Sequence, residues 1–118
     1  MILVDTSIWV DHFRKGSDKL ASLLQSVEVA THPFVIGELS CGHLKNRGAI
    51  LELLAELPQV TLAEHEEVLT LVESRKLMGT GIGWRDAHLL ASALLSGTPL
   101  WTADTKLRSL SAMIGVLY

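Results

Sequence analysis

Four acidic residues spread along this chain could act together as a set of carboxylates. Asp5 and Asp104 each follow a short apolar segment with the pattern of a strand. Glu38 and Asp86 each lie near the start of a helical pattern, on the side that carries apolar residues. Acidic side chains are rarely buried unless they are paired or bound to a cation. Acids at these positions therefore predict a binding or catalytic site, although a helix cap is the simple alternative for Asp5 or Ser7.

Short apolar segments alternate with helical patterns along the whole chain. The expected strands cover residues 2–4, 27–30, 60–62, 99–102 and 115–118, and the clearest expected helices cover 64–77 and 84–96. This alternation predicts an α/β fold with a mainly parallel central sheet. In such a sheet the carboxyl ends of strands and the starts of helices lie along one edge, where ligands bind. The four acids are therefore predicted to form one cluster at this edge.

Composition predicts one domain, residues 1–118, with enough apolar sequence for a real core. Apolar residues make up 48% of the chain, which is too many for disorder. The absence of long apolar segments and of a leader pattern, with a single cysteine at position 41, predicts a soluble, cytoplasmic protein. The net charge of −3 argues against a basic nucleic-acid-binding coat. That argument weakens if the four carboxylates hold cations, because removing them from the count raises the net charge by four, to +1.

Four carboxylates in one cluster need cations or protons. Two bare carboxylates about 6 Å apart repel each other by roughly 3 kcal/mol at an effective dielectric constant near 20. Because the set has only oxygen ligands, with no histidine or cysteine, it favours Mg²⁺ or Mn²⁺ over zinc. Asp5 and Asp86 are the first choice as direct ligands. Glu38 and Asp104 are expected to be ligands too, or to orient an attacking water.

The segments around these acids resemble the PIN domain family, and more closely its VapC-type toxins from toxin–antitoxin modules. The resemblance covers nearly the whole chain and rests on Val4-Asp5-Thr6-Ser7, Gly37-Glu38-Leu39, Arg85-Asp86-Ala87-His88 and Trp101-Thr102-Ala103-Asp104. It implies a PIN-like three-layer α/β/α sandwich and a Mg²⁺-dependent endoribonuclease whose acidic set is Asp5, Glu38, Asp86 and Asp104. It also implies a homodimer that a cognate VapB-type antitoxin neutralises.

Hydroxyl and basic residues near the acids complete the expected site. Three hydroxyls are candidates to fix the orientation of the carboxylates, those of Thr6, Ser7 and Thr102. Four basic residues are candidate contacts to RNA phosphates, with ordinary solvated charge as the alternative: Arg14, Lys15, Arg85 and Lys106. Water activated by a metal needs no ribose 2′-hydroxyl, so the expected products carry a 5′-phosphate and a 3′-hydroxyl.

Other interpretations of the same sequence remain open. The main one is a non-catalytic PIN-like scaffold that binds protein or RNA, and a second is a DNA-directed nuclease with the same metal chemistry. The tryptophans are expected to be core or dimer contacts more than stacking platforms for bases: Trp9, Trp84 and Trp101. The five histidines show no metal-ligand spacing. Core packing is expected for one leucine-rich helix, with a dimer or antitoxin surface as the alternative: Leu53, Leu54 and Leu57.

Overall fold

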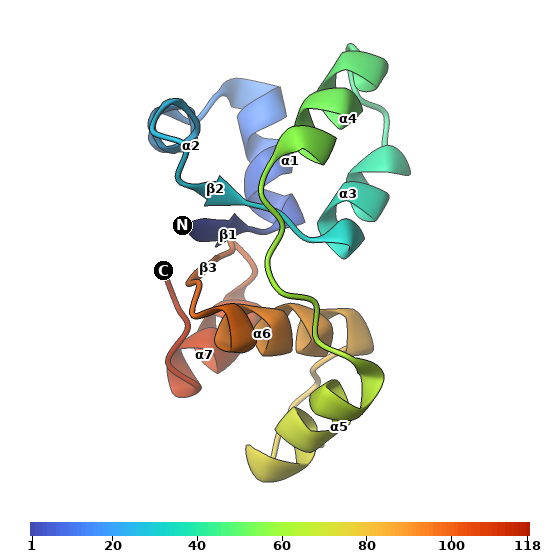
Figure 1. Cartoon of the computed structure of the whole chain (residues 1–118), viewed down its shortest axis with the longest axis vertical. Helices are drawn as coiled ribbons and strands as arrows, with labels where there is room; N and C mark the ends of the chain where they lie inside the picture. Colours follow the sequence, from blue (N-terminus) through green and yellow to red (C-terminus); the bar gives the residue numbers. More distant parts are fainter.

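A computed structural model of residues 1–118 has a small parallel sheet between two layers of helices (Figure 1). The strands β1 (Ile2–Val4), β2 (Val29–Ala30) and β3 (Leu100–Trp101) lie in the order β2-β1-β3. Ile2 pairs with Val29 on one side of β1, and Leu3 pairs with Leu100 on the other. The predicted α/β/α sandwich with a parallel central sheet is thus confirmed.

Seven helices form the two outer layers. One layer contains α1 (Thr6–Lys15), α2 (Asp18–Gln25), α3 (Pro33–Ser40) and α4 (Arg47–Glu56), and the other contains α5 (His65–Ser74), α6 (Trp84–Ser96) and α7 (Thr105–Met113) (Figure 1). The strand β1 lies between the layers, and its residues Leu3 and Val4 are fully buried. Leu20 from the first layer and Leu90 from the second are also fully buried. Burying a side chain of this kind stabilises the fold by about 1.5–3 kcal/mol.

Local sequence signals fix where several helices begin and end. Ser17 caps α2 by accepting a hydrogen bond from the Leu20 amide at 3.2 Å. Pro33 occupies the first turn of α3, where a missing N–H costs nothing. Gly97 ends α6 with a φ of 59°, a left-handed conformation that favours glycine.

Two of the expected strands are reduced to single bridges. Gln59 pairs with Thr31, after which the backbone amides of Thr61 and Ala63 bond to serine hydroxyls of α6 at 2.7 and 3.0 Å. These side-chain acceptors replace a strand partner, so residues 60–62 form no strand. At the end of the chain, Leu117 forms one bridge to Leu100 of β3.

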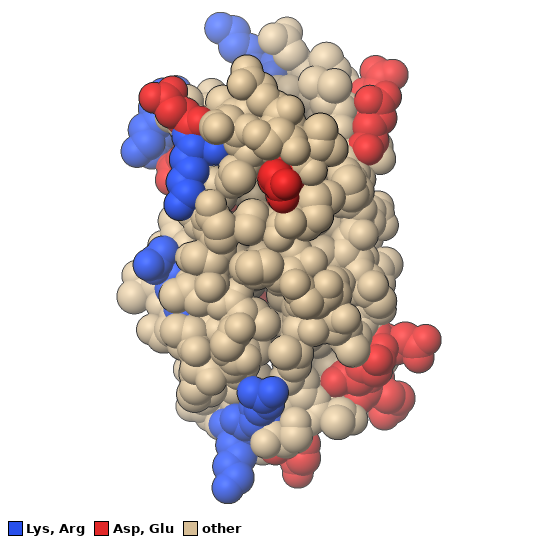
Figure 2. Space-filling view, turned by 60° about the vertical axis from the view of Figure 1, so that its left-hand side comes forward, with Lys and Arg blue, Asp and Glu red and all other residues tan.

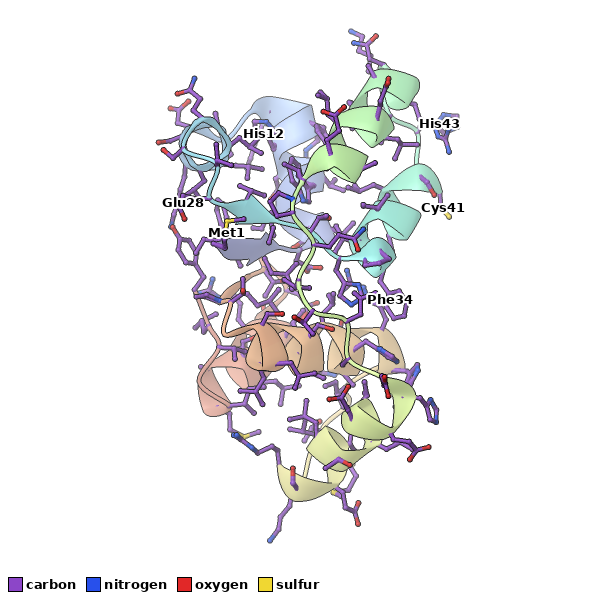
Figure 3. The ribbon with its side chains drawn as sticks, in the orientation of Figure 1. Met1, His12, Glu28, Phe34, Cys41 and His43 are labelled. Atoms are coloured by element: carbon purple, nitrogen blue, oxygen red, sulfur yellow. The ribbon has the colours of Figure 1, made fainter.

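Charged side chains do not form a basic coat on the face seen in Figure 2. Acidic and basic residues gather there toward the two ends of the molecule, with a broad uncharged area between them. The amino terminus is held by the Glu28 carboxylate, which lies 3.1 Å from the Met1 nitrogen (Figure 3). None of the helices is long and apolar enough to cross a membrane.

Candidate active site

The carboxyl ends of β1 and β3 bring two of the acids to the same edge of the sheet. Val4 pairs with Trp101 in parallel register, and the Asp5 amide donates to the Trp101 carbonyl at 2.9 Å. Asp104 follows β3 as the residue that precedes α7. The helices α3 and α6 supply the other two acids. One hollow of about 260 Å³ is lined by all four, and by three neighbouring polar residues and a leucine: Asp5, Thr6, Ser7, Glu38, Arg85, Asp86, Asp104 and Leu107.

Asp5 is the buried member of the set, with only 2% of its surface exposed. Its Oδ2 accepts hydrogen bonds from the Thr102 hydroxyl at 2.7 Å and from the Ser7 hydroxyl at 3.2 Å. The Asp5 side chain makes no capping bond to α1. A helix cap therefore does not account for this carboxylate.

The three hydroxyls named from the sequence all touch this network. Thr102 also accepts a hydrogen bond from the Asp104 amide at 3.1 Å, and Ser7 accepts one from the Ala103 amide at 3.0 Å. The bond between Ala103 and Ser7 ties the segment after β3 to the start of α1. The Thr6 hydroxyl donates to Glu38 Oε1 at 2.6 Å and so joins α1 to α3. The hydroxyls restrict how the carboxylates can turn, as side chains around metal ligands do.

Glu38 lies differently from what the sequence predicted, and Asp104 has an additional role. Glu38 was expected on the buried side of its helix, but Val35 and Leu39 form that side and the Glu38 side chain is 44% exposed. Each residue of an α-helix is turned by about 100° from the last, so Glu38 lies at the border of the buried stripe. Asp104 caps α7, because its Oδ1 accepts a hydrogen bond from the Leu107 amide at 2.8 Å.

The Arg85 guanidinium lies among the acids. It donates to Asp5 Oδ1 at 2.6 Å, to Asp86 Oδ1 at 2.7 Å and, through Nε, to Glu38 Oε1 at 2.8 Å. It also donates to the Thr6 hydroxyl at 3.0 Å. Burial alone would lower the pKa of Arg85, but the hydrogen bond to Asp5 and the surrounding carboxylates raise it above its ordinary value. The sequence had suggested this residue as a contact to phosphate, whereas here it binds carboxylates.

The donor set suits a hard divalent cation. Four carboxylates and their hydroxyl neighbours offer only oxygen, the donor that Mg²⁺ and Mn²⁺ prefer, and one guanidinium cannot balance four negative charges. With Arg85 bonded among them, no group of three or more Asp, Glu, His or Cys side chains has the spacing of a metal site. A cation would therefore have to rearrange these side chains. Cys41 and His43 point away from the body of the protein and make no zinc site (Figure 3).

None of the remaining basic candidates lines the acidic hollow. Arg14 is exposed, pairs with Asp11 at 3.4 Å and lines a cleft of about 650 Å³. That cleft shares Thr6 and Glu38 with the acidic hollow. Two further lysines remain without a carboxylate partner: Lys15, which is exposed at the end of α1, and Lys106, which packs over Gly81.

His32 is a positioning residue that the sequence analysis did not single out. Its Nδ1 accepts a hydrogen bond from the Phe34 amide at 3.0 Å and so caps α3, the helix that carries Glu38. Its Nε2 lies 3.3 Å from the Ser92 hydroxyl. Burial, then the nearby His88 and Arg85, lower the pKa of His32 to about 4, so the ring is neutral at pH 7. The sequence signal that could have predicted this cap is a histidine directly before a proline at the start of a helix.

The chain is similar to known proteins along nearly its whole length. The model of the PIN domain matches residues 2–112, a span that includes all four acids. The chain belongs to the PIN domain family. Two relatives of this PIN domain, each named Ribonuclease VapC32, come from the CDC 1551 / Oshkosh and ATCC 25618 / H37Rv strains of Mycobacterium tuberculosis. Both are 48% identical to it over 117 residues, which cover 98% of this chain and 94% of theirs.

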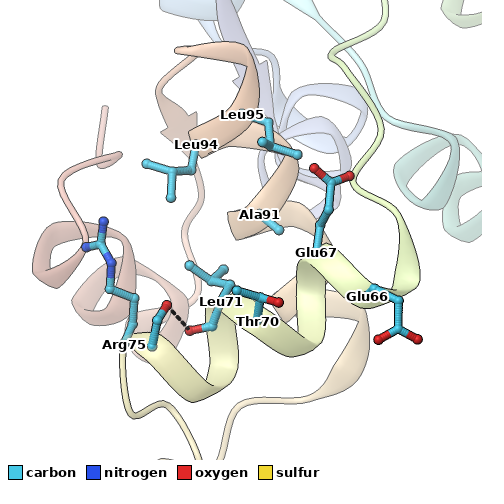
Figure 4. Close-up of a pocket in the computed structure, with 9 residues that line it drawn as sticks. Glu66, Glu67, Thr70, Leu71, Arg75, Ala91, Leu94 and Leu95 are labelled. Carbon is cyan, nitrogen blue, oxygen red and sulfur yellow. Dashed lines mark hydrogen bonds between the residues drawn. The ribbon is translucent and has the colours of Figure 1, made fainter.

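Two further hollows of this PIN domain are larger than the acidic one. A groove of about 490 Å³ between α1, α2 and α4 is mostly apolar and includes Trp9, Leu53 and Leu57. A second, of about 380 Å³ between α5 and α6, has Leu94 and Leu95 on one side and Glu67 and Arg75 on the other (Figure 4). Neither is lined by more than two carboxylates, so the acidic hollow with its four remains the candidate for chemistry.

Proposed function

We propose that this PIN domain is a Mg²⁺-dependent endoribonuclease that acts as the toxin of a toxin–antitoxin system. The observation that carries the proposal is the convergence of four carboxylates in one hollow at the carboxyl ends of β1 and β3. Similarity to Ribonuclease VapC32 along almost the whole chain supports RNA as the substrate. The same acids count against a binding-only scaffold, which would not need them.

The proposed acidic set would hold one or two Mg²⁺ ions, with Mn²⁺ as a substitute: Asp5, Glu38, Asp86 and Asp104. When bound, such ions lower the pKa of a water molecule and neutralise charge on the scissile phosphate. Thr102 and Ser7 hold Oδ2 of Asp5, and its Oδ1 is the oxygen that Arg85 bonds. Asp104 keeps its second carboxylate oxygen free of the capping bond, and this oxygen is available to orient water.

The test is cleavage of total and transfer RNA by purified protein freed of antitoxin, with Mg²⁺, Mn²⁺ or EDTA. Asp5→Asn is expected to lower cleavage by more than about a hundredfold. Mutation of residues that only orient metal ligands typically lowers activity by about 10- to 100-fold, and loss of a ligand should cost more. Asp11→Asn is the matched control, because Asp11 lies on α1, the helix that follows Asp5, and pairs only with Arg14. Fragments with 5′-phosphate and 3′-hydroxyl ends are expected. Folded protein that cleaves no RNA with any metal would favour the binding-only scaffold.

The proposed antitoxin partner has a suitable surface in the apolar groove between α1, α2 and α4. Val27 and Leu53 there are 70% and 64% exposed, which is costly unless a partner covers them. We expect Leu53→Asp to weaken copurification with the cognate VapB-type antitoxin, and Glu52→Lys on the same helix to leave it intact. RNA and antitoxin would both be met in the cytoplasm, where we propose that the protein acts.

The proposed homodimer has a second exposed apolar surface, defined by Phe34, Leu69, Met78 and Trp84. These side chains are between 39% and 51% exposed, and His88 joins Trp84 to Phe34 through ring contacts with centroid distances of 4.8 and 5.0 Å. An aromatic cluster of this kind is typical of interface cores. Trp84→Ser is expected to shift the sedimentation coefficient from dimer to monomer, and an unchanged dimer would exclude this surface as the interface.

A further inference from the structure

Arg85 binds the oxygens that a divalent cation would need. Its Nη2 bonds Asp5 Oδ1, its Nη1 bonds Asp86 Oδ1, and its Nε and Nη2 both bond Glu38 Oε1. Three acids from three separate elements are thus bridged by one side chain. Charge-assisted hydrogen bonds of this kind are the strongest that side chains make.

Two further carboxylate oxygens of the site are engaged by other groups. Oδ2 of Asp5 accepts from Thr102 and Ser7, so Oδ1 is the atom of this carboxylate that remains for a cation. Oδ1 of Asp104 caps α7. A cation that binds Asp5 through Oδ1 must therefore compete with Arg85 for that atom.

Arg85 can leave the acids without disturbing the core. It lies in the first turn of α6, and 29% of its side chain is exposed. Its neighbour in the helix, Ala87, is buried and anchors the backbone. A rotation of the arginine side chain about its own bonds would release all three carboxylates to solvent while α6 stays in place.

We propose that Arg85 is a built-in counter-cation that holds the acidic set together and competes with divalent cations for Asp5, Glu38 and Asp86. This inference rests on the proposed metal-dependent function. Arg85 is then a positioning residue: a cation must displace it from the carboxylates, and the cost of this displacement raises the cation concentration needed to fill the site. A purely structural role predicts the opposite, namely that loss of Arg85 scatters the carboxylates and weakens cation binding.

The experiment measures Mn²⁺ affinity by electron paramagnetic resonance on full-length protein, without RNA. The variants are Arg85→Met, which keeps the aliphatic stem, and Arg108→Met as the matched control. Arg108 is exposed on α7 and reaches only the Thr102 carbonyl, at 3.5 Å, so its loss removes the same charge without freeing a carboxylate. Arg85→Met is expected to tighten Mn²⁺ binding by about tenfold, equal to about 1.4 kcal/mol. Arg108→Met is expected to change it by less than about twofold.

Three outcomes would overturn the inference: weaker or unchanged Mn²⁺ binding by Arg85→Met, or equal tightening by Arg108→Met, which would reduce the effect to general charge. Failure of the proposed function gives a different result, in which wild-type protein and Asp5→Asn bind Mn²⁺ equally poorly. The measurement needs no nuclease activity, so the two failures are separable.

A second measurement uses the wild-type protein and does not depend on the folding of a variant. The Arg85 side-chain Nε–Hε signal in a ¹⁵N NMR spectrum reports its bond to Glu38. Diamagnetic Mg²⁺ is expected to shift this signal and to speed its exchange with water, at the concentrations that fill the site. A signal that stays unchanged while neighbouring amides respond to Mg²⁺ would show that Arg85 is not displaced.

Discussion

Thr102→Val tests how the most buried acid is held in place. Thr102 has no exposed surface, and valine has nearly the same shape. The substitution removes the hydroxyl that donates to Asp5 Oδ2 at 2.7 Å and accepts from the Asp104 amide at 3.1 Å. The carboxylate keeps its bonds to Ser7 and Arg85 but can then turn.

The size of the effect follows from these two bonds. A hydrogen bond to a charged group contributes about 1.5–3 kcal/mol, and a neutral one contributes about 1 kcal/mol. The amide of Asp104 is only partly buried, so water can replace most of its loss. We therefore expect Thr102→Val to lower the free energy of unfolding by about 3 kcal/mol. We also expect it to weaken Mn²⁺ binding by roughly 10- to 100-fold, as for other residues that orient metal ligands.

The assay is urea unfolding combined with Mn²⁺ titration, with Thr98→Val as the control. Thr98 is also nearly buried, but its hydroxyl donates only to the Ser96 carbonyl, at 3.3 Å. Thr98→Val is expected to lower the free energy of unfolding by less than about 1 kcal/mol and to leave Mn²⁺ binding unchanged. A Thr102→Val protein within about 0.5 kcal/mol of wild type, with unchanged Mn²⁺ affinity, would refute the view that Thr102 orients Asp5.

Two further predictions concern stability. The pKa of His32 falls from 6.5 to about 4 on folding, so the unfolded chain binds a proton at this histidine at a higher pH than the folded protein does. The contribution of His32 to stability is therefore complete above pH 6.5 and is lost as the pH falls toward 4. When the pH is lowered from about 7.5 to 5, protonation of His32 should reduce the free energy of unfolding by about 2 kcal/mol. His32→Asn should abolish this pH-dependent loss, and an equal loss in the variant would contradict the assignment. Gly81→Ala should cost about 1–2 kcal/mol, because φ is +86° and Lys106 occupies the space of the new methyl group. Gly37→Ala should instead stabilise the protein by up to about 1 kcal/mol, because Gly37 is helical with open space around it; thermal unfolding of both variants tests these opposite signs.

Much of the fold and the set of acids could be predicted from the sequence, because they depend on local signals. The observed helix α6 covers Trp84–Ser96, the range expected from its apolar pattern and from Gly97. The apolar run that ends at Asp5 forms the central strand β1, and β3 lies within the expected segment 99–102. Once strands and helices alternate, chain direction alone puts Asp5 and Asp104 at the same edge of the sheet.

Only the tertiary structure decided how the side chains around these acids are used. Residues 60–62 have a strand pattern, but the amide of Thr61 and that of Ala63, just after the segment, donate to serine hydroxyls of α6 and not to a strand. Arg85 looked like a free cation in the sequence because two of its carboxylate partners, Glu38 and Asp5, are 47 and 80 positions away along the chain. Glu38 was expected to be buried, yet Thr6 and Arg85 hold it at the rim of the hollow. Hydrogen bonds between residues far apart in the sequence depend on tertiary packing, so they cannot be predicted from local patterns of apolar and polar residues.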